Sequence, residues 1–283
     1  GPAGKAASID YYPKTSFIKL INESITVQDS VQKRLKIDRD WVLNKNNFNA
    51  YGEINDTSGV DTLYRNIYDP STFTGVVFKE SLEKYGARVK TISKKKTSNK
   101  SYKKVSNHLS KPLIHSATNL MNESDNLSAE LFVKSIGALD TLPGTWKVGL
   151  DSIKSFLAKK VLIDTSNIRL ADASGVSRYN LTSAAQLNSL LKWMYNSEYK
   201  DDFISTLPGG GWENSTLEKR LIDEGDLVRA KTGGLSGVRN LAGYIKSKKY
   251  GDVAFSILMN GYTDYSSRYA RVHDQIVKSI IYD

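Results

Sequence analysis

The C-terminal part of the chain contains three short strand-like segments followed by one amphipathic helix. Each segment contains β-branched or aromatic residues, and polar or glycine-containing turns separate the segments. The sequence therefore predicts three strands followed by a C-terminal helix. The strands are expected around Val228 to Lys231, Ala242 to Lys246 and Val253 to Met259, and the helix from about Ser266 to Ile281.

The chain changes character near Ser106. Residues 1–8 resemble an expression-tag scar and linker, because the sequence begins Gly1-Pro2-Ala3-Gly4. Residues 9–105 are predicted to form a β-rich accessory module with one helix from Ser71 to Tyr85 and a basic connecting stretch. Alternating residues predict strands at Ser24 to Val27 and at Trp41 to Leu43. Residues 106–283 are predicted to form the second block.

Helices joined by loops are expected before the C-terminal sheet. Apolar residues at helical spacing indicate them, and together with the strands they place the chain in the α+β class. The predicted helices run from Pro112 to Met121, from Ser124 to Ile136, from Gly149 to Lys160 and from Ser183 to Tyr195.

Two tripeptides in the second block match short motifs of known enzymes. Lys231-Thr232-Gly233 leads into the strand-like sequence from Val238 to Lys246, and Ser124-Asp125-Asn126 stands upstream at the start of a helix-like stretch. Both motifs occur in enzymes that acylate a serine with a penicillin or a D-Ala-D-Ala peptide. Taken alone, the first is also an ordinary solvated lysine at a strand, and the second is also a helix N-cap.

The sequence around both motifs resembles the serine-type D-alanyl-D-alanine carboxypeptidase/endopeptidase family of low-molecular-mass penicillin-binding proteins. The similarity is clear from about residue 106 to 283 and looser from about residue 15. It implies a β-lactamase/transpeptidase-like antiparallel sheet flanked by helices. The matching stretches are Asn122 to Glu130, Asp172 to Asn180, Thr206 to Gly210, Lys231 to Val238 and Leu241 to Tyr244.

The resemblance implies roles for the motif residues. Ser124 would relay a proton, and Asn126 would hold a carbonyl of the substrate, whereas Asp125 would have a structural role.

The Lys231-Thr232-Gly233 motif would bind the substrate. Lys231 would attract the terminal carboxylate of the substrate and bias the proton relay. Thr232 would hydrogen-bond the same carboxylate, Gly233 would let the substrate lie close to the strand, and the Gly234 N–H would donate to an oxyanion.

A third stretch of the family pattern is expected to brace this site. The residues are Asp172, Ser174, Ser177, Arg178 and Asn180, and without the resemblance they form an ordinary polar turn and helix cap. We expect these residues to hold the motif residues in position and not to contact the substrate.

The family's nucleophile, a serine in a helical Ser-x-x-Lys motif, is not assigned by the sequence. The early match is Ser16 to Lys19, but β-branched and aromatic neighbours favour a strand, which would send Ser16 and Lys19 to different faces. The expectation is therefore a chain that is incomplete at the N-terminus of its fold and does not turn over substrate.

Composition limits the remaining function classes. The chain has no cysteine and three histidines, so thiolate chemistry is excluded, and neither a metal site nor a cofactor is predicted. We expect His108, His115 and His273 to be surface or hydrogen-bonded residues.

The formal net charge of the chain is +10, and much of the excess lies in a basic stretch from Lys90 to Lys104. This stretch is more typical of a solvated connection between two structural blocks than of a polyanion-binding site. Nucleic acid is not an expected partner, because Tyr102 is the single aromatic residue in this stretch and aromatics are not interleaved along it.

The sequence thus predicts a periplasmic or exported carboxypeptidase/endopeptidase that acts on peptidoglycan stem peptides through an acyl-enzyme and is a target of β-lactams. No apolar run is long enough to span a membrane, although peripheral association with the cell envelope is compatible with the charge. Two alternatives remain open: a non-catalytic envelope- or peptidoglycan-binding protein with the same fold, and a β-lactamase-like hydrolase.

Overall fold

The computed structural model describes residues 1–28, 34–95 and 104–283. The chain divides into two compact units, residues 1–105 and 106–283. Most of the predicted basic stretch, residues 96–103, lies outside the described residues. Among the described residues, no helix is both long enough and apolar enough to cross a membrane.

The first unit is built around one long strand. Strand β4 (Asn47–Asn55) pairs in parallel with β1 (Lys19–Asn22) and then with β2 (Ile25–Val27), and it pairs antiparallel with β3 (Leu35–Arg39). The strand predicted at Ser24 to Val27 is confirmed as β2. The predicted helix is confirmed as α1 (Pro70–Lys84), which begins after the capping Asp69 and stops before Gly86, a residue with φ of +84°.

The strand predicted at Trp41 to Leu43 is wrong. These residues form the turn between β3 and β4, where the Asn44 N–H donates to the Trp41 carbonyl, and their side chains are largely exposed. The segment is three consecutive apolar residues, and no neighbouring strand pairs with it in the described structure. Asn44 takes φ of +52°, as tight turns often require.

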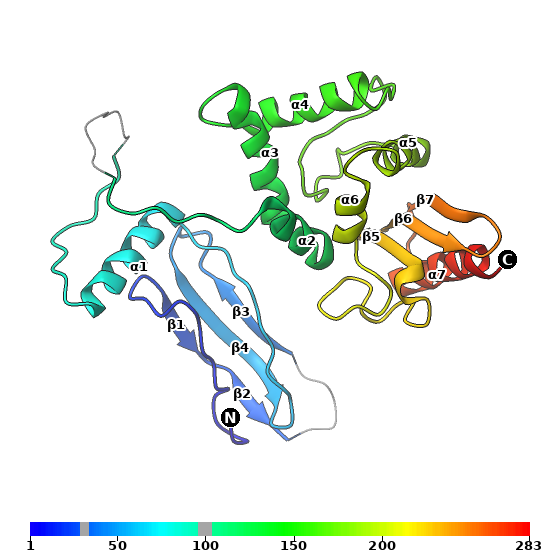
Figure 1. The fold of residues 1–283 in the computed structure, drawn as a ribbon. Coiled ribbons are helices and arrows are strands. Elements are labelled where there is room, and N and C mark those ends of the chain that lie inside the picture. Colours follow the sequence, from blue (N-terminus) through cyan, green and yellow to red (C-terminus); the bar gives the residue numbers. More distant parts are fainter. Residues whose placement is uncertain (29–33, 96–103) are drawn as a thin grey trace. The chain divides into compact units, whose positions relative to one another are not determined.

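The second unit contains an antiparallel three-stranded sheet, as predicted. Its order is β5 (Val228–Leu235), β6 (Val238–Ser247) and β7 (Gly251–Asn260), with β5 at one edge. Helix α7 (Ser266–Tyr282) covers one face, as Figure 1 shows. The core between them includes Leu241, Val277 and Ile281, all fully buried.

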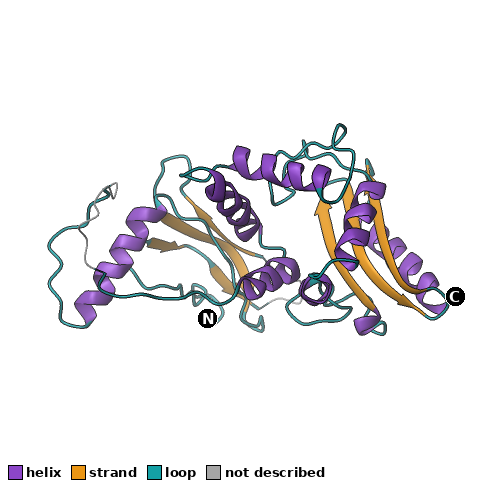
Figure 2. Ribbon diagram, turned by 45° about the horizontal axis from the view of Figure 1, so that its top comes forward, coloured by secondary structure: helices purple, strands orange, loops and turns teal. Residues whose placement is uncertain are grey.

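The opposite face of this sheet packs against α5 (Ala184–Tyr195) and α6 (Lys200–Thr206), as Figure 2 shows. Leu191, Leu207 and Tyr244 form the buried centre of this layer. The Tyr244 hydroxyl donates to the Leu191 carbonyl at 2.7 Å. Side chains that alternate along β5 and β6 therefore point into two different layers.

Three further helices precede α5: α2 (Leu113–Glu123), α3 (Asn126–Asp140) and α4 (Trp146–Lys159). Helix α2 packs against α6, and α3 packs against α4. The close approach of α3 and α4 depends on Gly149, because a Cβ there would lie 2.0 Å from the Val133 carbonyl oxygen. All four helices predicted before the sheet are confirmed within a few residues, but α6 was not predicted.

Candidate active site

Ser124 lies at a sharp break between two helices. It is the C-cap of α2, with φ of 60° and ψ of 48°, and its N–H donates to the Leu120 carbonyl. Asp125 then caps α3, accepting hydrogen bonds from the N–H groups of Leu127 and Ser128. A left-handed conformation is costly for serine, and such residues gather at functional sites. The predicted helix from Ser124 therefore begins two residues later, at Asn126.

Lys231 brings the two motifs together. It lies on β5, and its Nζ donates to the Ser124 Oγ at 2.7 Å and to the Thr232 carbonyl oxygen at 3.2 Å. Burial lowers the pKa of Lys231 to about 8, because the charged ammonium loses solvation there. The lysine is thus not a solvated strand residue, and it can exchange a proton near neutral pH.

The residues after Lys231 lie on the edge strand of the sheet. Thr232, Gly233 and Gly234 pair with Leu241, Asn240 and Arg239 of β6. On the other side of β5, the described residues add only an isolated bridge between Gly209 and Arg229. The backbone from Lys231 to Gly234 can therefore accept an extended peptide as an added strand. Asn126 is exposed at the first position of α3.

The loop after α4 is organised by two side chains. Asp172 accepts hydrogen bonds from the N–H groups of Gly175 and Ser177 and from the Asn180 side chain. The side-chain Oδ1 of Asn180 accepts a hydrogen bond from the Ala171 N–H at 2.7 Å. Both polar side chains thus hold the loop backbone in place.

Two contacts fasten this loop to the motif-bearing elements. Glu130 of α3 accepts the Ser174 N–H at 2.9 Å and the Ala173 N–H at 3.3 Å. Arg178 donates to the Ser236 carbonyl oxygen at 2.7 Å, in the turn between β5 and β6. Sequence reasoning assigned no role to Glu130. Its position four residues after Asn126, on the same side of one helix, was the available signal.

Ser16 belongs to the first unit and precedes a strand. It lies in a turn, Lys19 begins β1, and the Ser16 hydroxyl donates to Glu80 Oε1 at 2.5 Å. The Ser16 N–H donates to the same oxygen at 2.8 Å. The segment is therefore not a helix that would place Ser16 and Lys19 on one face.

The expectation for His273 is wrong. His108 and His115 are exposed, but His273 is fully buried on α7, and neither ring nitrogen has a hydrogen-bond partner in the described structure. Burial and the charges of Arg220 and Arg239 lower the pKa of His273 to about 4. Among the described residues, no group of three His, Cys, Asp or Glu side chains is placed to hold a metal ion.

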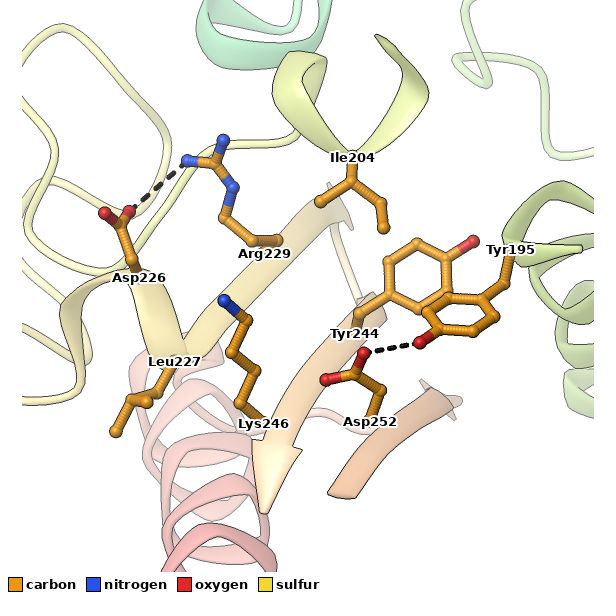
Figure 3. Close-up of a pocket in the computed structure, with 8 residues that line it drawn as sticks. All are labelled: Tyr195, Ile204, Asp226, Leu227, Arg229, Tyr244, Lys246 and Asp252. Atoms are coloured by element: carbon orange, nitrogen blue, oxygen red, sulfur yellow. Dashed lines mark hydrogen bonds and ion pairs between the residues drawn. The ribbon is translucent and has the colours of Figure 1, made fainter. Parts of the chain in front are cut away.

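A small cavity of about 40 Å³ lies near the start of β5, as Figure 3 shows. Arg229 and Tyr244 line it, and a hydrogen bond from Tyr195 to Asp252 closes one side. Its volume suits an ordered water molecule and not a peptide. Neither Ser124 nor Lys231 lines it, so it is separate from the candidate site.

Comparison with known families decides the assignment. The family model described as D-Ala-D-Ala carboxypeptidase 3 (S13) family matches residues 2–279. The chain belongs to this family. The predicted resemblance to serine-type D-Ala-D-Ala carboxypeptidases among the penicillin-binding proteins is confirmed.

Individual relatives in the carboxypeptidase family agree. A D-alanyl-D-alanine carboxypeptidase of Actinomadura is 30% identical over 270 residues, which are 92% of this chain and 49% of the relative. The D-alanyl-D-alanine carboxypeptidase DacB of Haemophilus influenzae is 34% identical over 160 residues, or 55% of this chain and 33% of the relative. The chain thus spans about half or less of the curated relatives it matches.

A solved structure shows the same fold. Penicillin binding protein 4 (dacB) of Haemophilus influenzae, crystallised with a β-lactam, matches with a TM-score of 0.76 at 23% identity. The match covers 100% of this chain and 67% of that chain. This similarity supports the predicted α+β fold with helices and sheets.

Proposed function

We propose that this chain binds the C-terminal carboxylate of peptides that end in D-Ala-D-Ala. The protein to which it belongs would be a serine-type carboxypeptidase/endopeptidase that cleaves peptidoglycan stem peptides through an acyl-enzyme and is a target of β-lactams. It would act in the periplasm or after export. The observation that carries this proposal is the 2.7 Å hydrogen bond between Lys231 and Ser124.

The lowered pKa of Lys231 suits a proton relay. With a pKa of about 8, the lysine is mostly protonated at neutral pH but gives up its proton far more readily than a solvated lysine does. The Ser124 hydroxyl can accept a proton and donate its own. A proton can therefore pass between a reacting group and Lys231 through Ser124. The positive charge also attracts an anionic end group.

The edge of β5 would position the substrate. An extended peptide that adds to this edge would form backbone hydrogen bonds with the segment from Lys231 to Gly234. The Thr232 hydroxyl would donate a hydrogen bond to the terminal carboxylate, and the exposed Gly234 N–H would donate a hydrogen bond to the developing oxyanion. The Asn126 amide would hold a carbonyl of the substrate from α3.

Acylation needs a nucleophilic serine that the geometry does not assign. Ser16 is disfavoured because its hydroxyl is engaged by Glu80 and its segment is not helical. We propose that the 283-residue chain binds the peptide without being acylated. Labelling with a fluorescent penicillin, followed by intact mass measurement, should then give no adduct. An adduct at Ser16 or Ser124 would contradict this part of the proposal.

Calorimetric titration tests the binding itself. The ligand is an N-acylated peptide that ends in D-Ala-D-Ala, compared with its C-terminal carboxamide. We expect the carboxylate to bind more tightly and Lys231→Met to remove most of the difference, while Lys219→Met, a matched change at an exposed lysine, leaves it intact. Equal binding of both ligands would count against the proposal.

A further inference from the structure

The side chain of Arg239, on β6, is charged and has no hydrogen-bond or ion-pair partner among the described residues. Its Nε is buried and unpaired. Burial and the nearby Arg220 lower the pKa of Arg239. Leaving this buried Nε–H unpaired is costly, so an acceptor that reaches the guanidinium would stabilise it.

The carboxylate that attracts Arg239 already binds another arginine. Asp274 attracts Arg239 electrostatically, but it forms the bidentate partner of Arg220, whose Nη2 and Nε lie 2.7 and 3.2 Å from its Oδ1. His273, which also faces this group, is fully buried and disposed to stay neutral. Two guanidinium groups thus share one carboxylate, and the charge of Arg239 is poorly compensated.

Gly234 lets Arg239 extend toward the edge of the sheet. The two residues form a cross-strand pair, and a Cβ on Gly234 would lie only 3.1 Å from the Arg239 Nη1. The guanidinium therefore lies over a residue that has no side chain. Because β5 is the edge strand, the guanidinium lies beside the peptide-binding edge.

Thr232 lies on the same face of β5 as Gly234, because side chains two residues apart in a strand point the same way. Lys231 points to the opposite face, toward Ser124. A carboxylate at the edge of β5 would thus meet the Thr232 hydroxyl and Arg239 from one side and Lys231 from the other. A guanidinium presents a planar pair of donors that matches the two oxygens of a carboxylate.

We propose that Arg239 is a specificity-determining residue that binds the terminal carboxylate of the substrate together with Thr232. This inference rests on the proposed function, since it concerns the same peptide. It adds a second cation to the site and gives Gly234 a further role, which is to leave space for the guanidinium.

The test follows the Gly233 and Gly234 amide signals by NMR at constant ionic strength. The probes are N-acetyl-D-Ala-D-Ala, its C-terminal carboxamide, and sodium acetate. For the unchanged chain we expect the carboxylate peptide to bind about tenfold more tightly than the carboxamide, and acetate to shift the Gly234 amide. Arg239→Gln should remove most of both effects, and Arg239→Lys should retain part of them.

Arg271→Gln is the matched control, because it removes one positive charge from an exposed position on α7. It should leave both effects unchanged. If Arg239→Gln keeps its overall spectrum and still prefers the carboxylate as the unchanged chain does, the inference is overturned while the proposed function stands. If the peptide fails to bind but acetate shifts Gly234 in an Arg239-dependent way, the anion site stands and the proposed function fails. No acetate response in the unchanged chain overturns the inference.

Discussion

The Nζ of Lys231 donates a hydrogen bond to the Oγ of Ser124 at 2.7 Å. The first residue comes from an edge strand and the second from a break between two helices. This contact joins two motifs that are far apart in the sequence, and it combines a lysine of lowered pKa with a hydroxyl that can relay its proton.

The backbone strain at Ser124 can be measured with two substitutions. Ser124→Ala and Ser124→Gly both remove the hydroxyl, but only glycine adopts φ of 60° without a Cβ penalty. We expect the glycine variant to be more stable than the alanine variant by about 1 kcal/mol. Urea unfolding of both variants measures the difference. Equal stabilities would show that the left-handed conformation carries no cost.

Burial of Lys231 predicts a specific pH dependence of stability. The folded pKa is about 8 and the ordinary value is 10.5, so between these values the unfolded chain binds more protons. The free energy of unfolding contributed by Lys231 therefore rises as the pH increases from 8 to 10.5. Relative to Lys231→Met, the unchanged chain should gain stability across this window. A difference that is constant with pH would contradict the lowered pKa.

The low pKa of His273 predicts that the protein loses stability as the pH falls. The folded pKa is about 4 and the ordinary value is 6.5, so the unfolded chain takes up the proton first as the pH falls. The unchanged chain should lose on the order of 2–3 kcal/mol from this residue between pH 6.5 and 4. His273→Phe should remove that part of the loss, as followed by thermal unfolding at several pH values. An identical acid profile for both chains would refute the prediction.

Glu130 predicts the local stability of the supporting loop. Its carboxylate accepts the backbone N–H groups of Ala173 and Ser174, so Glu130→Gln should weaken both hydrogen bonds. We expect faster hydrogen exchange at these two amides and little change elsewhere. Glu213→Gln, at an exposed position, is the control. Unchanged exchange at Ser174 would show that the loop does not depend on Glu130.

Much of the second unit could be predicted from the sequence because its periodic patterns agree with its burial. Helix α5 begins after the capping Ser183, and its apolar stripe packs on the sheet as the spacing indicated. Helix α7 and the three strands follow in the same way. Short apolar runs were less informative. Trp41 to Leu43 is a short apolar run that lies in a turn, because strand pairing depends on neighbours that a local pattern does not contain.

The motif residues could be named from the sequence, but their environment could not. No local pattern reveals that Ser124 is left-handed, that burial lowers the pKa of Lys231, or that His273 lies buried beside two arginines. The surroundings of Glu130 and Arg239 come from residues distant in the chain, such as Ser174 for Glu130 and Asp274 for Arg239. These features arise from tertiary contacts, which fix solvation and charge at each site.

Backbone amide shifts on addition of an N-acylated D-Ala-D-Ala peptide show whether the peptide binds along the edge of β5. The largest shifts should fall on Thr232, Gly233, Gly234 and Asn126, and they should weaken in Lys231→Met. Shifts that gather around the cavity of Tyr195 and Arg229, with the amides of Thr232 to Gly234 unmoved, would contradict binding at this edge.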